Sequence, residues 1–454
     1  MLVDTATLAQ LAPGFTGRFL QPADGEYDDA RRVHNGLVDK HPALIARCRG
    51  VADVCDAVKL ARTLKLEISV RGGGHNVAGL AVLDGGLMID LALMKGIHVD
   101  PRASVARAQG GVLWAELNRE TQLHGLATTG GVIGSTGISG LTLGGGLGWL
   151  MPKYGLALDN LLSVEMVMAD GGVTRASADE NADLFWAIRG GGGNFGIVTS
   201  FEYALHQVGP MIMGGLVAHP LAKAREVLQF FREQAASAPD ELMMAAGFIH
   251  APDGSGAKLV AIVAAHCGSL ADGEAVLGPF KTFGPPVLDA MGPITYNAQN
   301  ALFDAGLPRG ALNYWKSQFL TGLSDEAIAI LTERFAACDS PMSQILIEHF
   351  HGAASRVPIS ATACAMRVTG FNVAIIAQWM DPRQNEACIA WGRGTFAGLK
   401  PFLAATRYVN YLDNDEAGDP VAAAYGPNYS RLRKLKRKYD PENLFHANVN
   451  IRPA

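Results

Sequence analysis

The sequence has few of the features that mark secreted or membrane-spanning proteins. Its 454 residues include six cysteines, which are scattered and form no CxxC pair, so we expect reduced thiols rather than a disulfide framework. No stretch of about 18 apolar residues is free of charge, which predicts that no helix spans a membrane. Residues 1–5 lack the basic stretch and apolar run of a signal peptide, and we expect a cytoplasmic protein.

An excess of positive charge is also missing. The net charge of −5 and the pI near 6.2 argue against nucleic acid as the main partner. Residues 431–438 carry six basic side chains, but leucines share this segment, which favours a solvated helix over a surface for nucleic acid or anionic membrane. The length and the 49% hydrophobic content allow two or three domains with their own cores.

Glycine is abundant but unevenly spread. The 53 glycines crowd into residues 71–86, 130–148 and 190–196. The first cluster, Arg71-Gly72-Gly73-Gly74-His75-Asn76, directly follows a predicted strand over 67–70. Three consecutive residues without Cβ let the backbone approach a ligand and turn its N–H groups inward, which suits a phosphate or pyrophosphate. The clusters together favour a nucleotide-type ligand over a purely structural role.

Two common nucleotide sites do not fit this context. A Rossmann site needs the glycine loop to open a helix, whereas this loop leads to a turn at 84–86 and a predicted strand over 87–91. The second run, 144–148, is not followed by the Gly-Lys-Ser/Thr of a Walker A loop. The glycine pattern therefore predicts a phosphate cradle of another kind.

The hydrophobic periodicity predicts two regions with different arrangements of helices and strands. The first half has a predicted helix over 51–64, a hairpin from strand 163–168 through Asp170-Gly171-Gly172, a helix over 181–189 and a strand over 197–205. Beyond about residue 206, helices at 220–236 and 324–337 alternate with strands at 242–249, 258–266, 344–351 and 372–380. This second region is predicted to be antiparallel α+β. A final helix starts near Ser430 and stops at Asp440-Pro441.

The order of the motifs resembles the FAD-linked oxidases of the vanillyl-alcohol-oxidase type. Within them it is most similar to the berberine-bridge-enzyme-like branch, which includes bacterial hydroxynicotine oxidases. The resemblance covers residues 36–209 and 407–451. It rests on the run from Arg71 to Asn76, Asp84-Gly85-Gly86, the run from Thr136 to Gly148, Lys153-Tyr154-Gly155-Leu156 with Asp159-Asn160, the run from Gly193 to Val198, the run from Tyr439 to Phe445, and Asn448-x-Asn450-Ile451.

The resemblance implies an α+β fold with a bipartite FAD-binding domain of the PCMH type, built from two α+β subdomains. Residues 1–206 would form its first part, with a core over about 36–209, and residues 407–454 would return to it. Residues 207–406 would form a substrate domain whose antiparallel sheet is covered by helices.

The resemblance also implies the cofactor site. In the family the histidine of the glycine loop carries FAD through an 8α linkage, so His75 is the expected attachment point. Many relatives add a second bond from a cysteine, but Gly131-Val132-Ile133-Gly134 has none, so we expect mono-covalent FAD. The expected cofactor-binding residues are Arg71, Gly72, Gly73, Gly74, His75, Asn76, Gly79, Gly131, Thr136, Gly137, Ser139, Gly140, Gly145, Gly196, Ile197, Val198, Asn448 and Asn450.

Two residues are the expected catalytic groups. Tyr411 follows an asparagine, as does the family tyrosine that often serves as base, and it would need a cationic or hydrogen-bonding neighbour to act near neutral pH. Gln378 falls on a strand where relatives often place a glutamate base, so it would orient the substrate. Glu348, His349 and His351 alternate along another strand. His349 and His351 share a face of this strand, which is the minimum spacing for two metal ligands, but no third ligand is evident. We therefore expect these side chains to form a polar pocket wall rather than a metal site.

The expected activity is oxidation of an alcohol, amine or related small organic substrate by hydride transfer to flavin, with O2 as acceptor and H2O2 as product. The alternatives are a flavin dehydrogenase with another acceptor, a flavin-binding protein without turnover, and a Rossmann-type NAD enzyme. A monomer or a homodimer is expected, without nucleic acid or membrane as partner.

Overall fold

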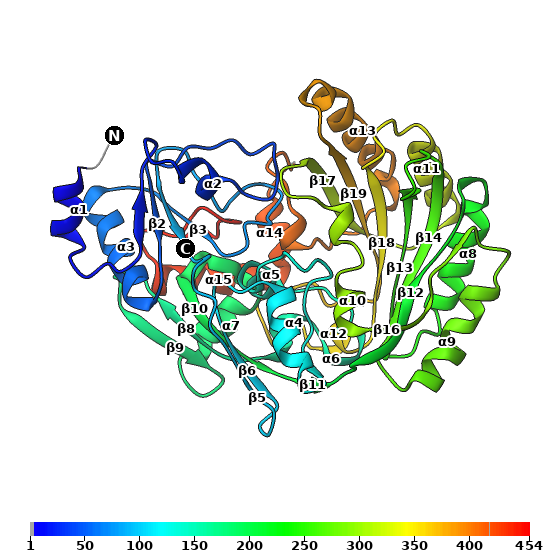
Figure 1. Cartoon of the computed structure of the whole chain (residues 1–454), viewed down its shortest axis with the longest axis horizontal. Helices are drawn as coiled ribbons and strands as arrows, with labels where there is room; N and C mark the ends of the chain where they lie inside the picture. Colours follow the sequence, from blue (N-terminus) through cyan, green and yellow to red (C-terminus); the bar gives the residue numbers. More distant parts are fainter. Residues whose placement is uncertain (1–3, 417) are drawn as a thin grey trace.

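The computed structural model describes residues 4–416 and 418–454 and has two lobes (Figure 1). Helix α1 (Thr5–Leu11) and the C-terminus lie on the same lobe. The expectation that residues 1–5 form no signal peptide falls partly on residues 1–3, which lie outside the described residues. In the described ranges, no helix has both the length and the apolar character needed to cross a membrane.

A four-stranded sheet supports the first glycine loop. Its order is β1 (Arg18–Leu20), β2 (Leu44–Arg47), β4 (Leu87–Asp90) and β3 (Ile68–Arg71), and β2, β4 and β3 run parallel. Helix α3 (Val51–Leu64) connects β2 to β3 and buries Val54, Ala57, Val58 and Ala61. The predicted helix over 51–64 is confirmed, and the predicted strands over 67–70 and 87–91 are confirmed to within one residue.

A five-stranded antiparallel sheet supports the other glycine clusters. Its order is β5 (Ile97–Asp100), β6 (Val105–Gln109), β10 (Ile197–Ala204), β8 (Leu161–Val167) and β9 (Val173–Ser177). Strands β8 and β9 form the predicted hairpin, whose Gly171 has a φ of +80°, a conformation that glycine adopts without steric cost. Helix α7 (Ala182–Gly191) follows β9 and contributes to the same buried core.

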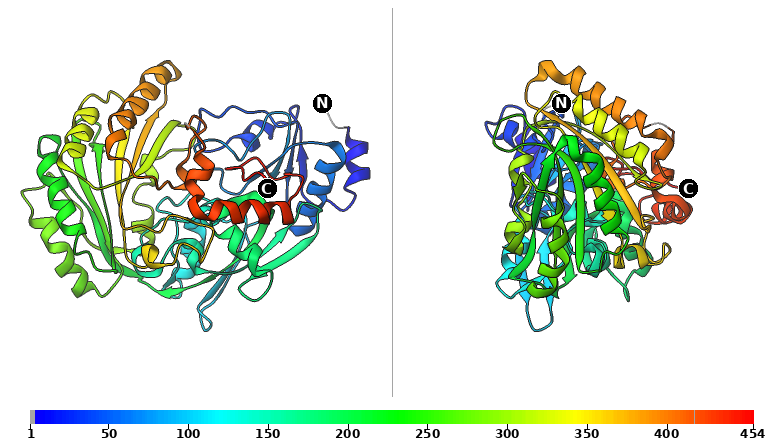
Figure 2. Two further views of the ribbon diagram at one scale, coloured as in Figure 1. Left: turned by 180° about the vertical axis from the view of Figure 1, so that it is seen from behind. Right: turned by 90° about the vertical axis from the view of Figure 1, so that its right-hand side faces the viewer.

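The second lobe is one large antiparallel sheet. Its order is β15 (Leu288–Asp289), β12 (Met211–Pro220), β14 (Lys258–His266), β13 (Leu242–His250), β18 (Gln344–Phe350), β19 (Gly370–Trp379) and β17 (Leu312–Leu320), and β16 (Gly292–Thr295) also pairs with β12. Helices α8 (Ala224–Ala235), α9 (Leu270–Thr282), α11 (Asp325–Ala336) and α13 (Asn385–Gly398) cover its outer face (Figures 1 and 2). The predicted α+β class, with an antiparallel sheet covered by helices, is confirmed.

The C-terminal segment returns to the first lobe. Helix α14 (Pro420–Tyr425) leads to α15 (Tyr429–Tyr439), which lies across that lobe in Figure 2 and packs against α7. Leu432 of α15 and Ile451 are fully buried in the same core as α7. The divisions at residues 206 and 406 remain a proposal.

The remaining α-helices and strands are short. They are α1 (Thr5–Leu11), α2 (Tyr27–Arg31), α4 (Trp114–Gln122), β7 (Leu126–Ala127), α5 (Ile138–Gly144), α6 (Met151–Tyr154), β11 (His206–Gln207), α10 (Tyr296–Asn300) and α12 (Ala353–Arg356). The loop before α5 contains Gly137, which is in close backbone contact with Gly73 of the first glycine loop.

Candidate active site

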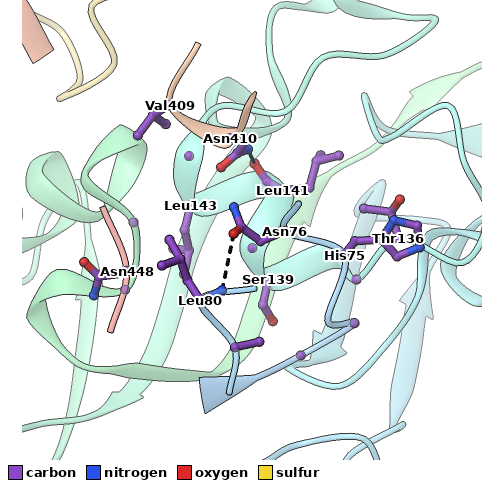
Figure 3. A pocket seen from close by; sticks show the side chains of 18 of the residues that line it. His75, Asn76, Leu80, Thr136, Ser139, Leu141, Leu143, Val409, Asn410 and Asn448 are labelled. Atoms are coloured by element: carbon purple, nitrogen blue, oxygen red, sulfur yellow. Dashed lines mark hydrogen bonds between the residues drawn. The ribbon is translucent and has the colours of Figure 1, made fainter. Parts of the chain in front are cut away.

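A cavity of about 320 Å³ lies between the two lobes and the C-terminal segment. Most of the predicted cofactor residues line it, and Figure 3 shows His75 beside Thr136 on one side of the view and Asn448 on the other. The predicted residues on its wall are Gly72, Gly73, Gly74, His75, Asn76, Gly131, Thr136, Gly137, Ser139, Gly140, Gly196, Ile197, Val198, Asn448 and Tyr411.

The two glycine loops touch through their backbones. A Cβ on Gly73 would collide with the backbone nitrogen of Gly137, and a Cβ on Gly137 would collide with Gly73 in return. By contrast, a Cβ on Gly140 or Gly193 would meet no protein atom within 4 Å, although both residues line the cavity. The loops are therefore in contact at one point and leave free backbone surface toward the cavity at others.

The first loop offers hydrogen-bond donors to a ligand. Within residues 4–416 and 418–454, none of the backbone N–H groups from Gly72 to Asn76 donates a hydrogen bond to the protein. A row of unpaired N–H groups attracts an anion such as a phosphate. Together with the bare glycines, this donor row fits a phosphate-bearing cofactor such as FAD.

Four predicted cofactor residues do not reach the cavity wall. Arg71 is buried and donates to both carboxylate oxygens of Asp90, with Nε to Oδ1 at 2.9 Å and Nη2 to Oδ2 at 2.6 Å. Gly79 and Gly145 have positive φ values, and a Cβ there would press against Val38 and Tyr408, respectively. Asn450 also lies outside the lining residues. Arg71, Gly79 and Gly145 thus contact neighbouring protein groups, and their role in cofactor binding stays a prediction.

His75 is held on two sides. Its Nε2 lies 2.8 Å from Oγ of Ser135, and its ring stacks on His34 with a centroid distance of 3.9 Å. Burial, with a smaller contribution from the charge of His34, lowers the pKa of His75 to about 3. The imidazole is therefore neutral at physiological pH, the state in which a ring nitrogen has a free lone pair.

A carboxylate forms the polar centre of the opposite wall. Glu348 of β18 is 4% exposed; its Oε2 accepts a hydrogen bond from Nδ2 of Asn372 at 2.8 Å, and its Oε1 accepts one from the hydroxyl of Tyr411 at 3.2 Å. Burial raises the pKa of Glu348 to about 7, although both hydrogen bonds act in the opposite direction. Ser317 donates to Oδ1 of Asn372 at 3.0 Å, which fixes the orientation of that amide.

The role of Tyr411 as the base stays a prediction, and the surroundings of its hydroxyl do not favour it. The phenol was expected to need a neighbour that lowers its pKa, but burial and the Glu348 carboxylate raise the pKa of Tyr411 well above its usual range. Tyr411 therefore stays protonated and acts as a hydrogen-bond donor. The group of the pair that can take up a proton near neutral pH is Glu348.

The role of Gln378 in orienting the substrate also stays a prediction that its position does not favour. Its side chain is fully buried, its Nε2 donates to the carbonyl of Gly306 at 2.9 Å, and it is not among the residues that line the cavity. Gln378 shares a strand and a face with Asn372, but six residues of β19 separate them, which is about 20 Å along the strand. Gln378 therefore lies at the wrong end of the strand to orient a substrate.

Strand alternation places the polar side chains around β18 on two different faces. Glu348 points toward the cavity, whereas His349 and His351 point away from it and stack on each other at 4.2 Å. The described residues contain no group of three or more His, Cys, Asp or Glu side chains arranged to hold a metal.

Several lining residues were missed. Asn35 donates through Nδ2 to the carbonyls of Val77 and Asn313, at 2.8 and 2.9 Å, and so joins the glycine-loop region to β17. Trp315 of β17 meets the Tyr411 ring edge-on at 5.8 Å. Strand β17 was not predicted, and no local motif marks either contact, because the partners are far apart in the sequence.

Comparisons with known proteins agree with this geometry. Residues 42–177 match the FAD binding domain family, and residues 407–452 match the family described as berberine and berberine like. The chain is 33% identical to (R)-6-hydroxynicotine oxidase of Paenarthrobacter nicotinovorans, over 96% of this chain and 97% of that protein. It is 30% identical to an FAD-linked oxidoreductase of Dictyostelium discoideum, over 91% and 89% of the two chains.

Solved structures show the same fold. The crystal structure of 6-hydroxy-D-nicotine oxidase from Arthrobacter nicotinovorans superposes with a TM-score of 0.87 at 31% identity, over 97% of this chain and 99% of that one. A xylooligosaccharide oxidase from Myceliophthora thermophila gives a TM-score of 0.86 at 23% identity, over 98% and 99%, which concerns the fold alone. The chain belongs to the FAD-linked oxidases of the berberine-bridge-enzyme-like family.

Proposed function

We propose that this FAD-linked oxidoreductase oxidises an amine or alcohol at the carbon next to the nitrogen or oxygen, with Glu348 as the base. The observation that carries the proposal is the buried Glu348 carboxyl group on the cavity wall, whose pKa of about 7 suits proton transfer near neutral pH. FAD, when bound, accepts the hydride and passes two electrons to O2, giving H2O2.

The protein side chains handle the proton. An Oε atom of Glu348 takes the proton from the substrate N–H or O–H as the neighbouring C–H bond gives up its hydride, so that the product is an imine or a carbonyl compound. Tyr411 and Asn372 donate to the same carboxylate and hold it in one orientation. Neither donor needs to lose its own proton.

We further propose that FAD is attached through His75 alone. The loop from Gly72 to Asn76, residues 136–140 and residues 192–198 would hold the cofactor. The neutral imidazole of His75 supports a nucleophilic role, and the segment from Gly131 to Gly134 offers no cysteine for a second bond. We also propose that residues 1–206 and 407–454 together form the flavin domain and that residues 207–406 form the substrate domain.

Acid precipitation of the purified protein tests the attachment. A yellow pellet, with the flavin on the peptide that contains His75, is the expected result. His75→Ala should fold and release its FAD into the supernatant. A wild-type pellet without flavin, or covalent flavin in His75→Ala, would refute the attachment.

An amine is the favoured substrate class. The cavity wall includes the apolar side chains of Met243, Leu307 and Trp315 and the carboxyl group of Glu348, and an aromatic ring with a carboxyl group suits a flat, weakly basic amine. The relative named as a hydroxynicotine oxidase supports the same class.

A panel of amines and alcohols that includes 6-hydroxynicotine tests the activity. We expect an amine to bleach the flavin anaerobically, and readmitted air to restore the colour with release of H2O2. Reoxidation by a dye but not by air would indicate a dehydrogenase. If no compound bleaches the flavin, the protein binds flavin without this turnover.

A further inference from the structure

Tyr411 lies in a loop whose own backbone gives it little support. The loop contains only a single 3-10 turn, Val409–Tyr411, in which the Tyr411 N–H donates to the carbonyl of Tyr408 at 3.1 Å. The helix that follows, α14, lies between the two lobes in Figure 1. On the side before Tyr411, Nδ2 of Asn410 donates to the carbonyl of Leu141 at 3.1 Å, and the Tyr408 hydroxyl accepts from the Gly146 N–H at 3.0 Å. Contacts at the two ends of the loop add to this support.

A cluster of charges joins the two ends of this loop. Nη1 of Arg407 pairs with Oε2 of Glu416 at 2.6 Å, and Nζ of Lys316 on β17 pairs with Oε1 of Glu416 at 2.9 Å. Lys316 also pairs with Asp415. Both ends of the loop are thereby attached to the edge strand of the large sheet.

These ion pairs are removed from solvent. The side chains of Lys316 and Glu416 are 6% and 4% exposed, and that of Arg407 is 16% exposed. Burial opposes the charge of Lys316, but its carboxylate partners outweigh burial and raise the pKa of this ammonium group. Loss of one partner from such a buried group leaves a charge uncompensated and is costly, whereas an exposed pair contributes little.

The loop also contacts the segment that follows the first glycine loop. Nδ2 of Asn414 donates to the carbonyl of Ala78, three residues beyond His75, at 2.8 Å. On β17, Lys316 lies between Trp315, which contacts the Tyr411 ring, and Ser317, which holds the Asn372 amide. One short piece of β17 thus supports both donors to Glu348.

We propose that Lys316, Glu416 and Arg407 form an ionic clasp that positions the Tyr411 hydroxyl against Glu348. The three are positioning residues, because they act through Tyr411 and lie outside the lining residues of the cavity. The inference deepens the proposed function and rests on Glu348 as the base. In the described part of the chain, Asn372 and Tyr411 are the polar groups that influence the pKa of Glu348, so this pKa reports the placement of Tyr411.

The test compares Lys316→Met with Tyr411→Phe and with the double variant in the purified holoenzyme. The pKa of Glu348 is read from the infrared band of its protonated carboxyl group, which Glu348→Gln identifies by removing it. Loss of the Tyr411 donor should raise this pKa by about 1 in each single variant, because a hydrogen bond to a charged group stabilises the carboxylate by roughly that amount. The double variant should show no further rise, as expected for residues that act on one contact.

Hydrogen exchange gives a second reading that needs no substrate. Amides of residues 407–416 should exchange at least about tenfold faster in Lys316→Met, while those of β18 keep their rate. Lys316→Arg should restore slow exchange. Arg393→Gln is the matched control, since Arg393 pairs with Asp415 at 2.8 Å but is 59% exposed, and it should change neither reading.

An unchanged or lowered pKa of Glu348 in Lys316→Met, beside a raised pKa in Tyr411→Phe, would overturn the positioning role. If Lys316→Met does not fold, Glu416→Gln is used, which keeps the shape of the side chain and removes its charge. Failure of the proposed function is distinct, because it would show as a wild-type flavin that no substrate reduces, whatever the clasp variants do.

Discussion

The rate of anaerobic flavin reduction by substrate should rise with pH through about 7. Glu348 can accept a proton only when ionised, and burial raises its pKa to about 7. About one tenth of the molecules carry the carboxylate near pH 6 and about nine tenths near pH 8, so the rate constant should increase about tenfold between them. The measurement is stopped-flow loss of flavin absorbance, with the amine of the panel that reacts fastest.

Two variants distinguish the contribution of Glu348 to this pH dependence from that of a titrating group on the substrate. Glu348→Gln keeps the size of the side chain but cannot take a proton, so it should be slower by about 100-fold or more and lose the contribution of Glu348 to the pH dependence. Tyr411→Phe should retain the dependence and move it to higher pH, because the hydroxyl favours the carboxylate. An identical pH dependence in wild type and Glu348→Gln would refute Glu348 as the base.

Three further predictions concern stability and the cofactor. The pKa of Glu348 is raised from 4.5 to about 7 in the folded protein, so the wild-type protein should lose up to about 3 kcal/mol of folding stability as the pH rises from below 4.5 to above 7. Near pH 8, Glu348→Gln should therefore melt at a higher temperature than the wild-type protein. Equal Tm values at that pH would contradict this prediction. Gly140→Ala should leave the fold of the apoprotein intact, since its Cβ meets no protein atom, but weaken FAD binding in a titration; unchanged affinity would mean that the cofactor does not pass there. Gly73→Ala should disturb the contact with Gly137 itself and lower the Tm even without FAD, and a wild-type Tm would contradict it.

Local sequence patterns predicted the elements whose periodicity is undisturbed. Helix α3 and strands β13 and β14 were placed to within one residue, because one apolar stripe or one continuous apolar run decided each of them. Strand β12 was missed because Gly214 and Gly215 interrupt its apolar pattern. Strand β17 was missed because polar residues such as Asn313 and Ser317 occupy its inner face, where they face the cavity and Asn372 instead of an apolar core.

The glycine clusters indicated which loops line the cavity, but not which of their glycines face it. The clusters line the cavity, since a backbone that lacks Cβ is needed wherever two loops or a loop and a ligand come close. The sequence could not distinguish Gly140, which faces open cavity, from Gly79, which faces Val38. Arg71 was predicted to bind the cofactor, whereas in the structure its guanidinium group donates to both carboxylate oxygens of Asp90.

The sequence by itself determined the family, the α+β class and the glycine cradle with His75 on its wall, because these depend on residue order and on local backbone requirements. Only the tertiary structure decided which side chains meet around Glu348. Glu348, Asn372 and Tyr411 come from separate parts of the chain, and strand register and the ends of one loop bring them together. A change of one residue in the register of β18 would turn Glu348 away from the cavity, and no local pattern records that register.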